Sequence, residues 1–117
     1  MTHEEKKVTK IVEELSLYFF AAGADHIQSE IKRIEDDFTI LFRANFSPDR
    51  LHDVERLEKY LNGEKNDGME DIYWGLAGSG DPGEASQLLL VGMMIDHAKI
   101  QLEGDEVVLH LTKKIND

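Results

Sequence analysis

Two stretches of the chain alternate apolar and polar residues with the two-residue period of β-strands. In residues 38–46 every even position is apolar. Because successive side chains of a strand point to opposite faces, this pattern predicts a strand with one face in a core. Residues 98–102 and 107–111 alternate in the same way on either side of residues 103–105, Glu-Gly-Asp, which predicts a hairpin near the end of the chain. The fold is therefore expected to contain a sheet.

Residues 25–34, which precede the first alternating stretch, fit two structures. Ile27, Ile31 and Ile34 have a spacing that also suits one face of a helix. The acidic cluster at residues 35–37 would serve as a turn, and this favours a strand that forms a hairpin with the strand after it. We expect the hairpin and keep a helix as the alternative.

A helix is predicted before each hairpin and another between them. In residues 2–23, Thr2 and Glu5 form the pattern of a capping box and Gly23 is a C-terminal stop signal. The apolar stripe of this helix consists of Val8, Ile11, Val12, Leu15, Tyr18, Phe19 and Ala22.

The middle helix is expected to begin at Ser47-Pro48 and to end at Asn62-Gly63. Its apolar stripe consists of Leu51, Val54, Leu57 and Leu61. Residues 64–83 are rich in glycine and predict a loop, interrupted by the apolar patch at residues 72–74. Residues 85–95 are apolar nearly all round, which predicts a helix buried between layers. We expect a single domain, residues 1–117, of the α+β class: a two-layer sandwich with helices on one face of a mixed, mostly antiparallel sheet.

The charge and composition exclude several classes of partner. With 13 Lys and Arg against 24 Asp and Glu, the formal net charge of −11 repels nucleic acid and anionic lipid. There is no cysteine for a disulfide or a thiolate metal site, and no apolar run approaches the length of a membrane span. We expect a cytoplasmic protein that binds neither nucleic acid nor membrane.

The glycines before the last predicted helix match a phosphate-binding pattern. Gly78, Gly80 and Gly83 fit G-x-G-x-x-G just before a helix N-terminus. Asp81 and Glu84 put negative charge where a phosphate would lie. The segment is therefore either a flexible connector or a present or former phosphate loop.

No catalytic or metal-binding constellation is expected. The five histidines show no two-ligand spacing, and the acidic pairs fall on a polar helix face and in a turn. These histidines are His3, His26, His52, His97 and His110. The chain also lacks a G-x-S-x-G elbow and a lysine after the glycines.

The order of the expected elements, together with two sequence stretches, resembles the GHKL ATP-binding domain of sensor histidine kinases, anti-sigma-factor serine kinases, gyrase and a heat-shock chaperone. The stretches are residues 14–25, Glu-Leu-Ser-Leu-Tyr-Phe-Phe-Ala-Ala-Gly-Ala-Asp, and residues 78–85, Gly-Ser-Gly-Asp-Pro-Gly-Glu-Ala. The likeness extends from about residue 8 to residue 113. It implies that both hairpins lie in one sheet with helices on one face.

In this family the first helix carries a glutamate and, four residues later, an asparagine that binds magnesium with the nucleotide. Aligned on Glu14, this chain has Tyr18 at the asparagine position; aligned on Glu13, it has Leu17. The family motif Asp-x-Gly-x-Gly, whose aspartate reads adenine, has no counterpart in residues 43–49, which contain no glycine. The resemblance thus implies a degenerate member with a vestigial nucleotide site. Its cofactor-binding residues would be Glu14, Tyr18, Gly78, Gly80 and Gly83.

Three functions are compatible with these patterns. The first is a noncatalytic regulatory or interaction domain, with no bound cofactor, that binds another protein or forms a homodimer. The second is an ATP-binding kinase of the anti-sigma type, in which Glu14 would be the base and ATP with magnesium the ligand. The third is an unrelated α+β module that binds a small molecule.

Overall fold

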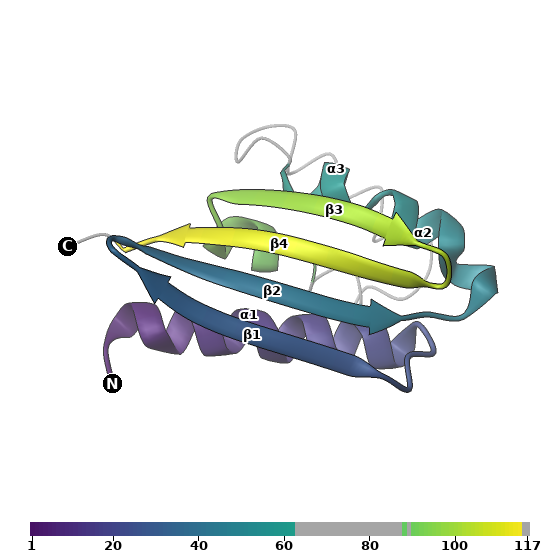
Figure 1. The fold of residues 1–117 in the computed structure, drawn as a ribbon, viewed down its shortest axis with the longest axis horizontal. Coiled ribbons are helices and arrows are strands. Elements are labelled where there is room, and N and C mark those ends of the chain that lie inside the picture. Colours follow the sequence, from purple (N-terminus) through teal and green to yellow (C-terminus); the bar gives the residue numbers. More distant parts are fainter. Residues whose placement is uncertain (63–87, 89, 116–117) are drawn as a thin grey trace.

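The computed structural model describes residues 1–62, 88 and 90–115 (Figure 1). In chain order the elements are α1 (His3–Ala21), β1 (Ile27–Ile34), β2 (Asp37–Asn45), the 3-10 helix η1 (Pro48–Arg50), α2 (Leu51–Glu55), α3 (Leu57–Leu61), β3 (His97–Glu103) and β4 (Glu106–Lys114). Residues 88 and 90–94 are also helical.

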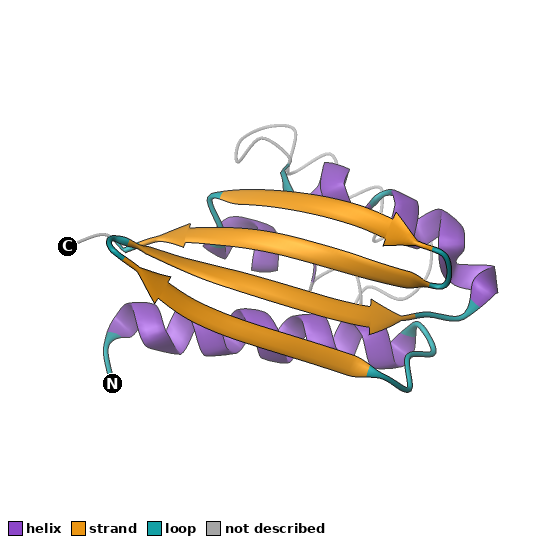
Figure 2. Ribbon diagram, viewed as in Figure 1, coloured by secondary structure: helices purple, strands orange, loops and turns teal. Residues whose placement is uncertain are grey.

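The four strands form one sheet in the order β1-β2-β4-β3, and every neighbouring pair is antiparallel. The described helices pack against one face of this sheet, and none of them lies on the other face (Figure 2). Each hairpin is local, and the pairing of β2 with β4 joins them: Ile40 lies opposite Leu111. The predicted α+β two-layer arrangement is confirmed, and the described strands are antiparallel throughout.

The hairpin predicted for residues 25–34 is present. β1 pairs with β2 in a register that places Ile34 opposite Asp37, so Glu35 and Asp36 form a two-residue turn. Glu35 adopts a positive φ of 54°, a left-handed conformation of the kind that such tight turns use. The alternative helix is therefore excluded. The terminal hairpin follows the same plan around Gly104, whose φ is +67°.

The core lies between the inner sheet face and the helices. The even positions of β2 are buried, as their alternation predicts, and the Phe42 ring lies 5.6 Å from that of Phe19 on α1. Burial of each such side chain contributes roughly 1.5–3 kcal/mol. Fully buried residues from both layers include Ile11, Leu15, Phe19, Ile40, Phe42, Leu57, Val91, Ile95, Leu109 and Leu111.

The ends of α1 follow the sequence signals. The Thr2 N–H donates to Glu5 Oε1 at 2.8 Å, and the Glu5 N–H donates to Thr2 Oγ1 at 3.1 Å, which completes the capping box. At the other end Gly23 has a φ of +94°, and a Cβ there would come within 2.8 Å of Ser47 Cβ. The Ser47 N–H donates to the Ala22 carbonyl at 2.9 Å, so the exit from α1 is held against the exit from β2.

The middle helix predicted from Ser47 to Asn62 is not continuous in the structure. Ser47 does precede a helical turn with proline in its first position, but its side chain makes no capping hydrogen bond. The chain forms three short pieces, because the Arg56 N–H bonds the Asp53 carbonyl three residues back and the helix tightens there. The predicted stripe is also shortened, since Leu51 is 40% exposed.

The helix expected at residues 85–95 is confirmed where the structure describes it, but burial on all sides is not. Leu88 and Val91 are buried, whereas Leu90 is partly exposed and Met93 is 62% exposed. The physical reason is the two-layer arrangement: a helix on the outside of a sheet has one side toward the core and one toward solvent. The predicted loop at residues 64–83 with its apolar patch lies outside the described residues. No described helix combines the length and apolar character needed to cross a membrane.

Candidate functional site

Glu14 and Tyr18, two of the residues proposed for a nucleotide site, lie one turn apart on α1 and are both buried. The Glu14 residue is 7% exposed and Tyr18 is 3% exposed. The Tyr18 ring packs edge-on against Phe19 at a centroid distance of 5.1 Å, within the core cluster. A tyrosine in this position supplies packing between the layers, not the amide oxygen that a metal site requires.

The carboxylate of Glu14 already has a cationic partner on its own helix. Lys10 Nζ lies 2.9 Å from Glu14 Oε1, an i,i+4 ion pair. The hydrogen bond to Glu14, with the nearby charge of Glu13, raises the pKa of the exposed Lys10 ammonium above its usual value. Glu14 is thus paired locally with Lys10, and any other basic group would have to compete with Lys10 for its carboxylate.

Of the five proposed cofactor-binding residues, the structure describes two, Glu14 and Tyr18. Glu14 and Tyr18 share one side of α1. Gly78, Gly80 and Gly83 lie outside the described residues, so their predicted role as a phosphate loop stays a prediction.

Asn45, which stands near the position where the family reads adenine, is engaged within the fold. Its Oδ1 accepts from the backbone N–H groups of Asp25 and His26, at 3.0 and 3.1 Å, and its Nδ2 donates to Asp25 Oδ1 at 2.5 Å. These three bonds fix the start of β1 beside the end of β2. The amide of Asn45 is consequently a structural group.

The other polar residues near the sheet ends are also used for structure. All five histidines are exposed, and the described residues include no group of three or more His, Cys, Asp or Glu that could hold a metal. Asp96 Oδ2 accepts from the Lys114 backbone N–H at 2.6 Å, so Asp96 holds the start of β3 beside the end of β4.

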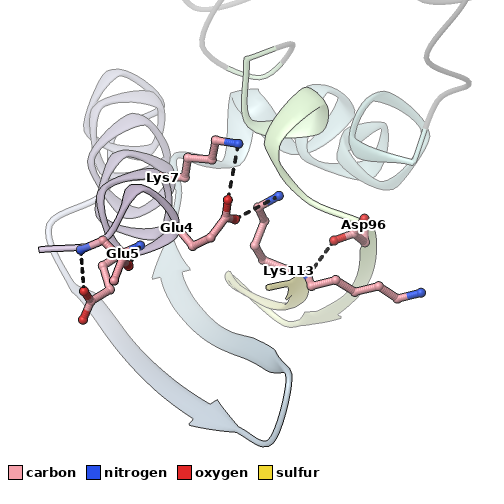
Figure 3. A network of polar contacts seen from close by, with 7 residues as sticks. Glu4, Glu5, Lys7, Asp96 and Lys113 are labelled. Atoms are coloured by element: carbon pink, nitrogen blue, oxygen red, sulfur yellow. Dashed lines mark hydrogen bonds and ion pairs between the residues drawn. The ribbon is translucent and has the colours of Figure 1, made fainter. Parts of the chain in front are cut away.

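A buried charge cluster, missed by sequence reasoning, lies between α1 and the end of β4 (Figure 3). Lys113 Nζ is 3.6 Å from Glu4 Oε2, and Lys7 Nζ is 3.7 Å from Glu4 Oε1. The side chains of Lys113 and Glu4 are only 8% and 12% exposed. Lys113 follows the inward-facing positions Val107, Leu109 and Leu111 at the same two-residue spacing. This spacing is the feature of the sequence that could have indicated a buried lysine. The cluster ties the first turn of α1 to the sheet.

A second missed contact lies at the β3 edge of the sheet. Asn62 follows α3, and its side chain bonds both backbone groups of Ala98 on β3: Nδ2 to the carbonyl at 2.6 Å and Oδ1 to the N–H at 2.8 Å. The sequence indicated only that Asn62 ends a helix. The side chain instead makes the two hydrogen bonds that the backbone of a neighbouring strand would make at this edge.

The hollows lined by described residues are small and open. One, of about 250 Å³, is lined by Gln28, Ser29, Glu30, Leu41 and Arg43 on the outer face; another, of about 170 Å³, is lined by Phe46, Pro48, Leu51, Gly104 and Asp105. Both fall below the roughly 300–1,000 Å³ of typical small-molecule sites. Neither supports a deep ligand pocket in this part of the chain.

No protein-family model matches the chain, and no curated protein matches its sequence.

Proposed function

We propose that the chain is a noncatalytic regulatory or protein-interaction domain built on a degenerate histidine-kinase-like ATPase fold. Two features support this fold: both hairpins belong to one sheet, and the helices cover one face of it (Figure 2). The GHKL resemblance requires both. We place the protein in the cytoplasm, since it lacks cysteine and has a strongly acidic composition.

The observation that best supports a loss of nucleotide binding is the burial of Tyr18, which stands at the position of the family's metal-binding asparagine. A phenol packed in the core cannot coordinate magnesium, and the neighbouring Glu14 is paired with Lys10. Removal of Tyr18 from the core to make room for a hydrated metal would cost several kcal/mol of packing, of the order of an aromatic-to-alanine change. The fold is therefore kept while the cofactor is lost.

The test is thermal unfolding of the full chain with ATP and magnesium. A ligand present at 100 times its dissociation constant stabilises the folded state by about 2.7 kcal/mol, which would raise the midpoint by several degrees. We expect no difference between ATP with magnesium, GTP with magnesium and magnesium sulfate alone. An upward shift with ATP and magnesium that the two controls lack would establish nucleotide binding and overturn the proposal in favour of an anti-sigma-type kinase.

A second measurement addresses the interaction role. We expect the folded chain to associate with a protein, and sedimentation at increasing concentration measures association with itself. A protein that stays monomeric in purified form and recovers no other protein from its own cell extract would leave the interaction role without support.

A further inference from the structure

The two edges of the sheet are not equivalent. At the β3 edge, Asn62 bonds both backbone groups of Ala98. At the β1 edge, the described residues place no side chain on the strand's backbone, and every residue of β1 except Ile27 is exposed. Ile31, with 44% exposure, is a large apolar residue on this strand. A long, open edge strand of this kind is a template for pairing with another strand.

The ladder between β1 and β2 determines which backbone groups face outward. The Asn45 N–H donates to the His26 carbonyl at 3.3 Å, so His26 points toward β2. Antiparallel ladders alternate, and the residues of β1 with even numbers therefore bond to β2 while those with odd numbers face the open edge. The same rule at the other edge puts Ala98 outward, where Asn62 bonds it. The outward backbone groups of β1 belong to Ile27, Ser29, Ile31 and Arg33.

We infer that β1 pairs antiparallel with β1 of a second copy of this chain, about a two-fold axis at Ile31. This register sets Ile31 opposite Ile31 of the second copy as a hydrogen-bonded pair, with Ser29 opposite Arg33 on either side. All the outward backbone groups between Ser29 and Arg33 then find partners. The result is a continuous sheet of eight strands, with the helices of both copies on the same face.

The charges of β1 select this register. Glu30 and Lys32 flank Ile31 on the outer face and already pair within one strand, at 3.1 Å. About the axis at Ile31, Glu30 of each copy lies opposite Lys32 of the other, at non-hydrogen-bonded positions where side chains are closest. An axis at Glu30 or at Lys32 would instead set like charges opposite each other. The strand is thus self-complementary in one antiparallel arrangement.

The dimer rests on the proposed function and names one partner for it. Different experimental outcomes would overturn the dimer and the noncatalytic role. An ATP-dependent rise in the unfolding midpoint would remove the noncatalytic role and leave the dimer standing. A monomer with no nucleotide response would remove the dimer and leave a regulatory domain with another partner.

The experiment is sedimentation equilibrium of the full chain and of charge-reversal variants from about 1 µM to about 1 mM, at an ionic strength of about 0.15 M, where screening acts over about 8 Å. The wild type is expected to dimerise. Glu30→Lys and Lys32→Glu each turn two attractive contacts into two repulsive ones and should raise the dissociation constant roughly tenfold. An equimolar mixture of these two variants restores opposite charges across the axis only, and it should form a heterodimer with at least the wild-type affinity.

Two further variants separate this contact from a general effect. Ile31→Pro deletes an outward N–H and leaves the N–H groups bonded to β2 in place, so the variant should fold, as circular dichroism would show, and be monomeric. Lys99→Glu reverses a charge on β3 at the other edge and should leave the dissociation constant unchanged. A monomeric wild type, a dimer that tolerates Ile31→Pro, or a mixture of the two reversed variants that stays monomeric would each overturn the inference.

Discussion

Asn62 and Ala98 are joined by two hydrogen bonds, in which the amide of the asparagine side chain takes the place of a strand backbone. Asn62 directly follows α3 and Ala98 lies near the start of β3, so this pair connects two elements that are 36 residues apart in sequence. It also satisfies backbone groups at the sheet edge that would otherwise depend on water.

Removal of this side chain should destabilise the protein. We expect Asn62→Ala to lower the free energy of unfolding by about 1–3 kcal/mol, because both Ala98 groups are partly buried and lose their partners. Urea denaturation at constant m-value measures the change. The matched control is Gln101→Ala, an exposed position on the same strand, which should stay within about 0.5 kcal/mol of the wild type. Equal effects of the two substitutions would contradict this role for Asn62.

The contribution of the buried Lys113 ammonium to the stability of the fold should depend on its partner Glu4. We expect Lys113→Met to cost about 2 kcal/mol, since it leaves the enclosed Glu4 carboxylate with only Lys7, whose side chain is 35% exposed. The double variant Glu4→Gln with Lys113→Met should recover most of that loss, because no unpaired charge remains. Lys114→Met, on the exposed neighbour, serves as the control. Chemical denaturation of the wild type, the single variants Glu4→Gln and Lys113→Met, and the double variant gives the coupling, and strictly additive effects would argue against the ion pair.

The two glycines with positive φ should differ in their tolerance of alanine. At Gly104 a Cβ would meet nothing within 4 Å, so Gly104→Ala should cost only the left-handed backbone strain, about 1 kcal/mol. At Gly23 the Cβ would also lie 2.8 Å from Ser47 Cβ, which should bring the loss to about 3 kcal/mol. Thermal unfolding of the two single variants tests the order. Similar midpoints would show that the junction of residues 22–24 with Ser47 can open without loss.

The capping box should make the stability of the start of α1 depend on pH. The backbone N–H of Thr2, and then its hydroxyl, lower the pKa of Glu5 below its ordinary value of 4.5. A carboxyl group whose pKa is lowered by folding stabilises the folded state above the unfolded value, and this contribution is lost as the pH falls through the folded value. The midpoint difference between wild type and Glu5→Gln should therefore be present at neutral pH, begin to decrease near pH 4.5 and disappear as the pH falls through the lower pKa of the folded state. An NMR titration of the Glu5 carboxyl checks the direction directly.

The strands and the cap of the first helix could be predicted because they depend on neighbours in sequence. A two-residue period decides which side chains of residues 38–46 face the core, and the Thr2-Glu5 spacing fixes a contact within one turn. The ion pair of Lys10 with Glu14 also follows from an i,i+4 spacing. These features require no knowledge of what packs above the sheet.

The features that could not be predicted depend on which distant element covers a given position. Lys113 has the parity of an inward residue, but only the placement of α1 above the end of β4 supplies Glu4 as its partner. The exposure of Met93 likewise follows from the tertiary arrangement, which overrides the periodic pattern. Of the proposed nucleotide site, the sequence predicts that Tyr18 lies on the apolar stripe of the first helix, whereas the burial of Glu14 requires the fold.

The junction between β2 and β4 also bears on how the protein reaches this structure. Each hairpin closes a two-residue turn and can form within microseconds, whereas Asn45 must pair with Glu106, about half of the chain away in sequence. The chain loses conformational entropy when this long loop closes, before contacts between the two hairpins can stabilise the closed state. We therefore expect the two hairpins to form early and independently, and their docking along β2 and β4 to set the folding rate.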